Sequence, residues 1–138
     1  MDDMPIEDIM TPRSVVFALR SSDTVGEVVE KHSPIAFSRI PVFETDLDHI
    51  VGIVNRYTLV NKQAEDQFHI RMKDLMKPIH SVIEKTSVSD VLDRFVKRRQ
   101  QMFFVTDDFG TTTGLITLED AIETLLGVEI VDEHDHVV

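Results

Sequence analysis

Apolar residues recur at helical spacing most clearly in the second half of the chain. They occupy positions i, i+3, i+4, i+7 and i+8 in the run Val88, Val91, Leu92, Phe95 and Val96. This spacing puts them on one face of an amphipathic helix, which we expect over residues 88–100. A shorter run of valines follows Thr24-x-x-Glu27, the pattern of a capping box, and predicts a helix that ends by Pro34.

Runs rich in β-branched and aromatic residues predict strands between these helices. The predicted strands cover residues 14–19, 38–43, 50–54, 81–84, 102–106 and 113–117. Pro41 inside the second of them indicates a sheet edge or a bulge, because proline cannot donate a hydrogen bond to the ladder. Short helices are expected at 56–60 and 118–126, and polar turns at 44–49 and 107–110.

The sequence contains two copies of one unit. The run from Gly52 to Thr58 matches the run from Gly114 to Asp120 at a spacing of 62. Residues 8–12 match 74–78 at a spacing of 66, and residues 39–43 match 102–106 at a spacing of 63. The nearly constant offset indicates a tandem repeat, each copy being strand, helix, strand, strand, helix. One copy would be small for an independent core, so we expect the two to pack together as one α+β domain.

Thr117 and Asp120 lie where the last predicted strand runs into a helix. Free backbone N–H groups and the positive end of the helix dipole attract anions at such a point. A phosphate could lie against Thr117, and Asp120 could accept hydrogen bonds from the hydroxyls of a sugar. The alternative is that Thr117-x-x-Asp120 is only a capping box for the helix over 118–126.

Composition narrows the class of partner. The 138 residues are 42% hydrophobic, enough for one well-buried domain, and 14 basic against 25 acidic residues give a net charge of -11. This charge argues against a nucleic-acid partner, and an anionic ligand would need a local basic group. The chain has no cysteine, no run of eighteen apolar residues and no signal peptide pattern.

Four separated motifs resemble the tandem cystathionine-β-synthase (CBS) domain pair. They are residues 9–13 (IMTPR), 38–43 (SRIPVF), 114–120 (GLITLED) and the acidic end 129–135 (EIVDEHD). Together they are most similar to the CBS pairs of CorC-type, haemolysin-like and cyclin-M-like membrane proteins. The resemblance implies two β-α-β-β-α repeats packed about a pseudo-twofold axis. The expected organisation is a first repeat at 1–62, a linker at 63–72, a second repeat at 73–128 and an acidic tail at 129–138.

The resemblance also implies a nucleotide cleft between the copies. There, Thr117 would lie near the phosphates and Asp120 on the ribose hydroxyls. In the first copy Asn55 and Thr58 stand at these positions, and Thr58 carries no charge, so we predict one competent site and one weak or empty site.

Further contacts come from the first copy. Arg39, with Ser38 and Ile40 beside it in the motif, would supply a phosphate contact; the alternative is that Arg39 is an ordinary strand residue facing solvent. Phe37 could stack on adenine or belong to the core. Thr11 and Val16 could form walls of the base pocket. The alternatives are that Thr11 only stops a helix and that Val16 is a core residue of a strand. These are the nucleotide-binding residues that we predict.

The resemblance implies a regulatory module that binds ATP or AMP, with Mg²⁺ accompanying ATP. It would be the cytosolic part of a membrane protein with a preceding transmembrane domain, on the cytoplasmic side of the inner membrane. That protein would take part in magnesium or cobalt efflux, and the module would form a homodimer. The alternative is a structural dimerisation module whose nucleotide cleft is degenerate.

No catalytic or metal-binding residues are predicted. The sequence offers no Ser/His/Asp order, no paired acid and base carboxylates and no Walker loop. We interpret the basic residues 97–99 as complementing the dipole at the end of their helix. His134 and His136 lie in an acidic terminus that we expect to be solvated rather than to bind a metal.

Overall fold

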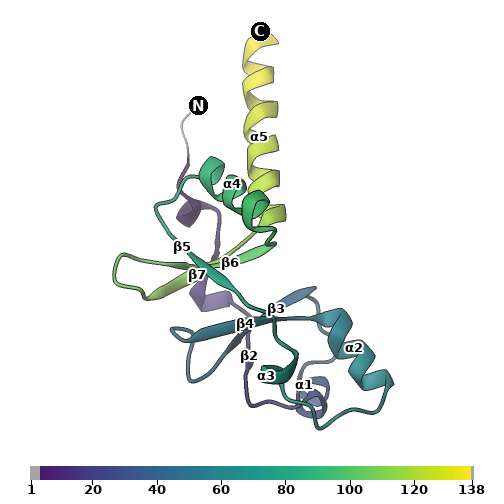
Figure 1. Ribbon diagram of the computed structural model, residues 1–138. Helices are drawn as coiled ribbons and strands as arrows, with labels where there is room; N and C mark the ends of the chain where they lie inside the picture. Colours follow the sequence, from purple (N-terminus) through teal and green to yellow (C-terminus); the bar gives the residue numbers. More distant parts are fainter. Residues whose placement is uncertain (1–3, 138) are drawn as a thin grey trace. The chain divides into compact units, whose positions relative to one another are not determined.

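The computed structural model describes residues 4–137, and for residues 128–137 the backbone alone. Its residues group into two compact units (Figure 1). Unit 1 combines the chain up to Val16 with the part from His80 onward, and unit 2 is Phe17–Ile79. Each unit contains one copy of the predicted order of strand, helix, strand, strand and helix.

Unit 2 holds a sheet of three strands in the order β2-β3-β4, with β2 parallel and β4 antiparallel to β3. Its elements are β2 (Leu19–Arg20), α1 (Val25–His32), β3 (Arg39–Phe43), β4 (Ile50–Asn55), α2 (Arg56–Ala64) and α3 (Met72–Leu75). The three helices lie on one side of this sheet (Figure 1) and contribute Val25, Val28, Leu59 and Met72 to its core.

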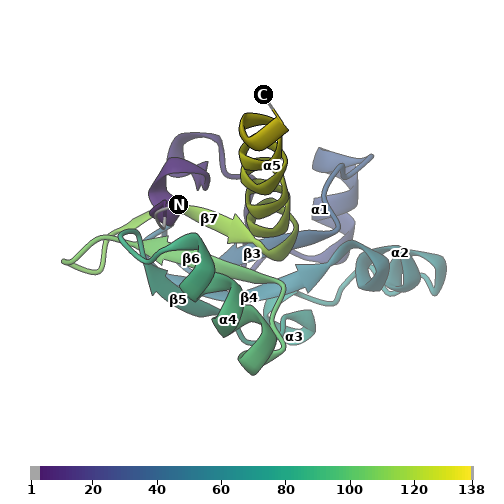
Figure 2. The same ribbon diagram turned by 90° about the horizontal axis from the view of Figure 1, so that it is seen from above.

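Unit 1 holds a sheet of four strands in the order β1-β7-β6-β5, in which β5 is parallel to β6 and the other neighbours are antiparallel. Its elements are β1 (Thr11–Pro12), β5 (His80–Ile83), α4 (Val88–Arg98), β6 (Met102–Thr106), β7 (Thr112–Thr117) and α5 (Leu118–Val137), with 3-10 turns at Ile6–Asp8 and Arg13–Val15. Figure 2 shows α4 lying across β5 and β6.

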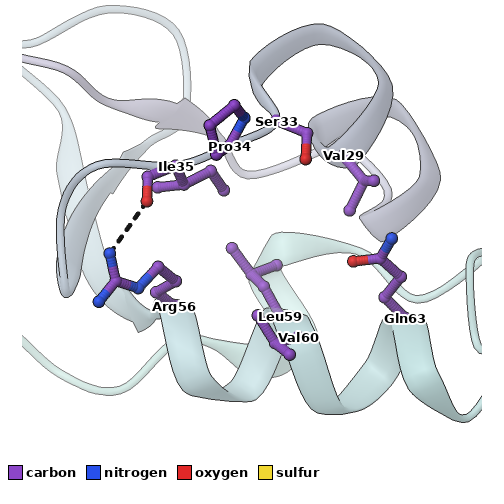
Figure 3. Close-up of a pocket in the computed structure, with 8 residues that line it drawn as sticks. All are labelled: Val29, Ser33, Pro34, Ile35, Arg56, Leu59, Val60 and Gln63. Carbon is purple, nitrogen blue, oxygen red and sulfur yellow. Dashed lines mark hydrogen bonds between the residues drawn. The ribbon is translucent and has the colours of Figure 1, made fainter.

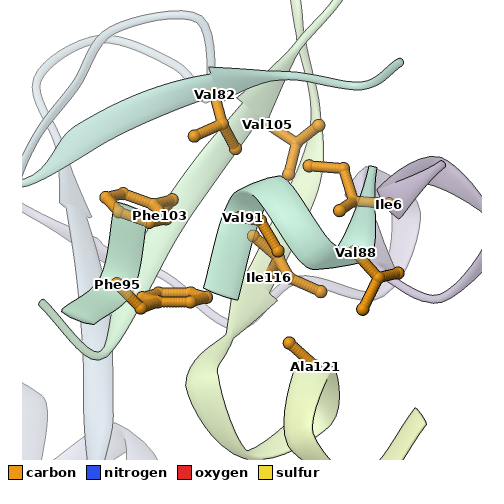
Figure 4. Close-up of a cluster of buried hydrophobic side chains, with 9 residues drawn as sticks. All are labelled: Ile6, Val82, Val88, Val91, Phe95, Phe103, Val105, Ile116 and Ala121. Carbon is orange, nitrogen blue, oxygen red and sulfur yellow. The ribbon is translucent and has the colours of Figure 1, made fainter. Parts of the chain in front are cut away.

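The core of unit 1 forms where the apolar face of α4 meets the sheet (Figure 4). Phe95 stacks on Phe103 with ring centroids 4.4 Å apart. The other buried members are Ile6, Val82, Val88, Val91, Val105, Ile116 and Ala121. The helical spacing read from the sequence therefore identifies this face correctly, although Val96 at its edge is 71% exposed.

Each repeat lends its opening segment to the sheet of the other. Thr11 of the first copy pairs with Leu115 in β7, while Lys77 of the second copy forms a bridge to Ile53 in β4. A glycine lies next to each of these segments: Gly114 next to Thr11 and Gly52 next to Met76. A Cβ on Gly114 would come within 2.3 Å of the carbonyl oxygen of Thr11, so this close approach of two backbones requires glycine.

Several local predictions are confirmed. Thr24 accepts a hydrogen bond from the backbone N–H of Glu27, whose carboxylate accepts from the N–H of Thr24, so the capping box is complete and α1 ends at His32. Pro41 pairs only with β4, because β2 reaches no further along β3 than Val42. On the β2 side Pro41 therefore stands at a sheet edge, as proline requires.

The strand predicted at 14–19 is wrong. Residues Arg13–Val15 form a 3-10 turn instead, and only Leu19–Arg20 is extended and paired. The chain passes from unit 1 to unit 2 at Val16, so this segment has no continuous strand to pair with. The helices predicted at 56–60 and 118–126 are too short, because α2 continues to Ala64 and α5 to Val137, through most of the predicted acidic tail.

Candidate functional site

The start of α5 is capped by Thr117 but the cap is incomplete. The hydroxyl oxygen of Thr117 accepts a hydrogen bond from the backbone N–H of Asp120 at 3.2 Å. Among the residues that the structure describes, the carboxylate of Asp120 forms no hydrogen bond or ion pair. This half-buried carboxylate lies in the first turn of α5, beside a hydroxyl group.

The complete capping box of α1 shows what is missing at α5. There the longer Glu27 side chain reaches back, and its Oε1 accepts from the N–H of Thr24 at 3.1 Å and from its hydroxyl at 3.0 Å. These hydrogen bonds hold the pKa of Glu27 below its usual value. An aspartate at the same position is one methylene shorter, so Asp120 keeps its acceptor oxygens available.

The chemistry of the α5 entrance suits a ligand with both hydroxyl and anionic groups. Asp120 can accept hydrogen bonds from a vicinal diol, since an ionised carboxylate is an acceptor only. Thr117 uses its oxygen as an acceptor, so its hydroxyl hydrogen is still able to donate to a phosphate oxygen. The helix dipole favours negative charge at the same point.

Two further predicted residues belong to the same unit. Thr11 pairs with Leu115, two positions before Thr117 on β7, although more than a hundred residues separate them in the sequence. Val16 is half-buried just after the 3-10 turn that follows β1, and its N–H donates to the carbonyl of Arg13 at 3.2 Å. Unit 1 therefore contains Thr11, Val16, Thr117 and Asp120.

The other four predicted residues belong to unit 2, around the start of β3. Phe37 is 53% exposed and stacks on Phe17 with ring centroids 5.8 Å apart. Ser38 is exposed, and Arg39 is half-buried opposite Asn55. Ile40 is fully buried in the core, so only its backbone could touch a ligand. Their roles in binding stay a prediction.

The equivalent helix entrance in the first copy is built differently. Asn55 occupies the N-cap of α2 but forms no side-chain capping hydrogen bond. Thr58 stands where Asp120 stands in the second copy, and it lacks a charge. The two entrances thus differ in the way that the sequence comparison of the copies indicates.

Sequence reasoning missed a hollow in unit 2 beside α2. It is lined by Arg56 among other residues, none of which the sequence analysis assigned to a site. The sequence signal was a basic residue at the first position of a helix, where the dipole disfavours a cation. Within the described part of the chain, no three His, Cys, Asp or Glu side chains group in a way that could hold a metal ion.

The repeated β-α-β-β-α order, with a glycine in the last strand of each copy, defines a class of tandem α+β module. The sequence model of the CBS domain matches residues 6–65 and 72–127, so the chain belongs to the CBS domain family as a tandem pair. Within this family, the homologues of the chain include CorC and UPF0053 proteins.

Three of these similarities can be stated in detail. The chain is 37% identical over 130 residues to UPF0053 protein MT1890 of Mycobacterium tuberculosis, covering 94% of this chain and 28% of that protein. It is 35% identical over 133 residues to the magnesium and cobalt efflux protein CorC of Escherichia coli, covering 96% and 45%. It superposes with a TM-score of 0.83 and 31% identity on the CBS domain of a bacterial CNNM/CorC family Mg²⁺ transporter in complex with ATP, covering 90% and 88%.

The chain thus spans less than half the length of these two curated relatives. In the described residues, no helix combines the length and the apolar character needed to cross a membrane.

Proposed function

We propose that this chain is a regulatory module that binds an adenine nucleotide, ATP or AMP, at the entrance of α5. The observation that carries the proposal is the incomplete cap, in which Thr117 satisfies the helix and leaves the Asp120 carboxylate without a partner in the described residues. The similarity to a CBS domain whose structure holds ATP supports the choice of ligand.

In this proposal each residue type has one task. Asp120 accepts from the ribose hydroxyls and Thr117 donates to a phosphate, with Thr11 and Val16 beside the base. Arg39, flanked by Ser38 and Ile40, supplies positive charge for the phosphates, and Phe37 an aromatic face for the adenine. Mg²⁺ accompanies ATP and reduces phosphate repulsion in a chain of net charge -11.

The homologues support a proposal for the cellular role. The module would be the cytoplasmic part of a CorC-type membrane protein that exports magnesium or cobalt, and it would act as a homodimer. Nucleotide can regulate such a protein only by binding one of its conformations more tightly than another. We infer no catalytic step, and a product assay on ATP should detect no hydrolysis.

Denaturation in the presence of ligand tests the proposal. A ligand that binds only the folded state stabilises it by about 2.7 kcal/mol at a hundredfold excess over Kd. Urea unfolding is measured with Mg-ATP, with AMP and with MgCl₂ alone as the control. No shift with either nucleotide would favour the alternative, a structural dimerisation module with a degenerate cleft.

Two matched variants then test the choice of site. Asp120→Ala removes the proposed ribose acceptor and Thr58→Ala alters the equivalent position of the first copy. Hydrogen bonds to charged groups contribute about 1.5–3 kcal/mol, so Asp120→Ala should weaken nucleotide binding by about tenfold or more. Thr58→Ala should leave the Kd nearly unchanged, and equal effects of the two would refute the assignment.

A further inference from the structure

Unit 2 contains a groove between the end of α1 and one face of α2, separate from the residues proposed to bind nucleotide (Figure 3). Its volume is about 180 Å³ and its walls are mainly aliphatic. The lining residues are Val29, Ser33, Pro34, Ile35, Arg56, Leu59, Val60 and Gln63. Figure 3 shows Arg56 at one end of the groove and Gln63 at the other.

Arg56 brings an uncompensated positive charge to this groove. One of its guanidinium N–H groups donates to the carbonyl oxygen of Ile35 at 3.0 Å. A guanidinium has five N–H donors, so the others remain available. The side chain is half-buried, and it forms no ion pair with any residue that the structure describes, although the chain carries a net charge of -11.

A second hollow of about 250 Å³ adjoins the first at Arg56 and Val60. Tyr57 and Ser38, which is one of the residues proposed to bind nucleotide, complete the lining of this second hollow. Arg56 therefore borders both spaces, of which the first is mainly aliphatic and the second includes the hydroxyl-bearing residues Ser38 and Tyr57.

This groove lies on a different face of α2 from the first-copy counterpart of Asp120. An α-helix turns by about 100° per residue, so Thr58 points roughly 200° away from Arg56. Arg56, Leu59, Val60 and Gln63 share the groove face. All of the lining residues belong to unit 2, so the groove is complete within one unit.

We propose that this groove binds a small organic anion with an aliphatic chain, such as a medium-chain carboxylate. The chain lies over Leu59 and Ile35, and the carboxylate pairs with the guanidinium of Arg56, whose planar fork matches two carboxylate oxygens. Apolar walls with one well-placed charged group are the usual composition of a small-molecule site. Arg56 forms no ion pair within the described residues, and its charge favours an anion over a neutral occupant.

Titration of the whole chain with hexanoate, followed by NMR of the isoleucine, leucine and valine methyl groups, tests this proposal. Hexanoate should shift the signals of Ile35, Leu59 and Val60. Hexanol lacks the charge and acetate lacks the chain, so each should bind at least about fivefold more weakly than hexanoate.

Matched variants separate the charge from the cavity. Arg56→Gln should weaken hexanoate binding by about fivefold, while Arg94→Gln, at an exposed position of α4, should leave it unchanged. Val60→Trp should block the groove, while Val96→Trp on the exposed face of α4 should not. The second pair tests the site even if the loss of the hydrogen bond to Ile35 disturbs the Arg56 variant.

The following results would overturn the proposal. Hexanol binding as tightly as hexanoate, or Arg56→Gln binding as tightly as the parent, would remove the role of the charge. Concentration-dependent shifts at Leu59 and Val60 without ligand would show that a second copy of the chain covers the groove. The nucleotide site is tested independently, since Asp120→Ala should weaken the binding of Mg-ATP and leave the hexanoate titration unchanged.

Discussion

Replacing Gly114 with alanine would disturb the pairing of β1 with β7. The added Cβ would lie 2.3 Å from the carbonyl oxygen of Thr11 and 2.8 Å from Sδ of Met10. The first contact is with backbone that the β1–β7 pairing holds in place, so it cannot be relieved by a change of rotamer. The two strands would have to separate.

The size of the effect can be set against Gly52, the matching glycine of the first copy. The three atoms nearest to a Cβ there would all belong to the side chain of Met76, at 2.7–2.8 Å. A change of rotamer can move Sδ and Cγ of Met76, but its Cβ is fixed by the backbone, so the crowding at Gly52 is relieved only in part. Overpacking a core typically costs 1–3 kcal/mol, so we expect about 3 kcal/mol for Gly114→Ala, where the contact is with backbone, and a smaller loss of about 2 kcal/mol for Gly52→Ala.

Urea denaturation of the two variants measures this difference. Gly127→Ala is the control, because a Cβ at this position in α5 meets nothing within 4 Å. Alanine is favoured over glycine inside a helix by about 0.5–1 kcal/mol, so the control should be neutral or slightly more stable. Equal losses at Gly114 and Gly52, or no loss at Gly114, would refute the argument from the backbone contact.

Two other predictions concern the core of unit 1 and a surface turn of unit 2. Phe95 is 1% exposed, so Phe95→Ala should reduce the free energy of unfolding by about 3–5 kcal/mol. The neighbouring side chain of Val96 is exposed, so Val96→Ala should change this free energy by about 0.5 kcal/mol or less. Urea denaturation measures both variants, and similar values for the two would contradict the packing. The hydrogen bond from His49 to Asp46 and the charge of Asp46 raise the pKa of His49. The pair therefore stabilises the turn at low pH, as long as Asp46 is ionised. This stabilisation is lost as the pH rises through the raised pKa of His49. An NMR titration should show Asp46→Asn lowering the pKa of His49, and an unchanged pKa would exclude the interaction.

Much of the fold could be predicted because local signals and tertiary packing agree. The helical spacing around Phe95 marks the face that packs on the sheet, and Thr24-x-x-Glu27 marks the start of α1. The repeat itself, read from matching motifs, predicts two copies of one order of elements, and this order is what each unit contains.

The failures lie where tertiary context overrides the local pattern. Val15 and Val16 favour a strand by residue type, but the chain changes units there and turns instead of pairing. The pairing of Thr11 with Leu115 could not be read from the repeat, since a duplicated sequence alone suggests that each copy is self-contained.

The candidate site was predictable in its residue types but not in its hydrogen bonds. The sequence left open whether Thr117-x-x-Asp120 is a capping box or a ligand site. In the structure the hydroxyl of Thr117 caps α5, but the carboxylate of Asp120 makes no return hydrogen bond within the described residues. The complete box of α1 has the longer glutamate at this position, so the outcome depends on the length of one side chain. The groove at Arg56 could not be predicted because its walls come from α1, α2 and the segment between α1 and β3.

The exchange of opening segments between the repeats has a consequence for dissecting this protein. A cut between Ala64 and Met72 would yield two peptides that each correspond to one sequence motif, yet neither would retain the strand partner that completes its own sheet. Each fragment alone would leave an uncovered flank prone to association with other chains. Mixed together, the fragments should restore each other, so the smallest piece able to fold independently is the duplicated pair.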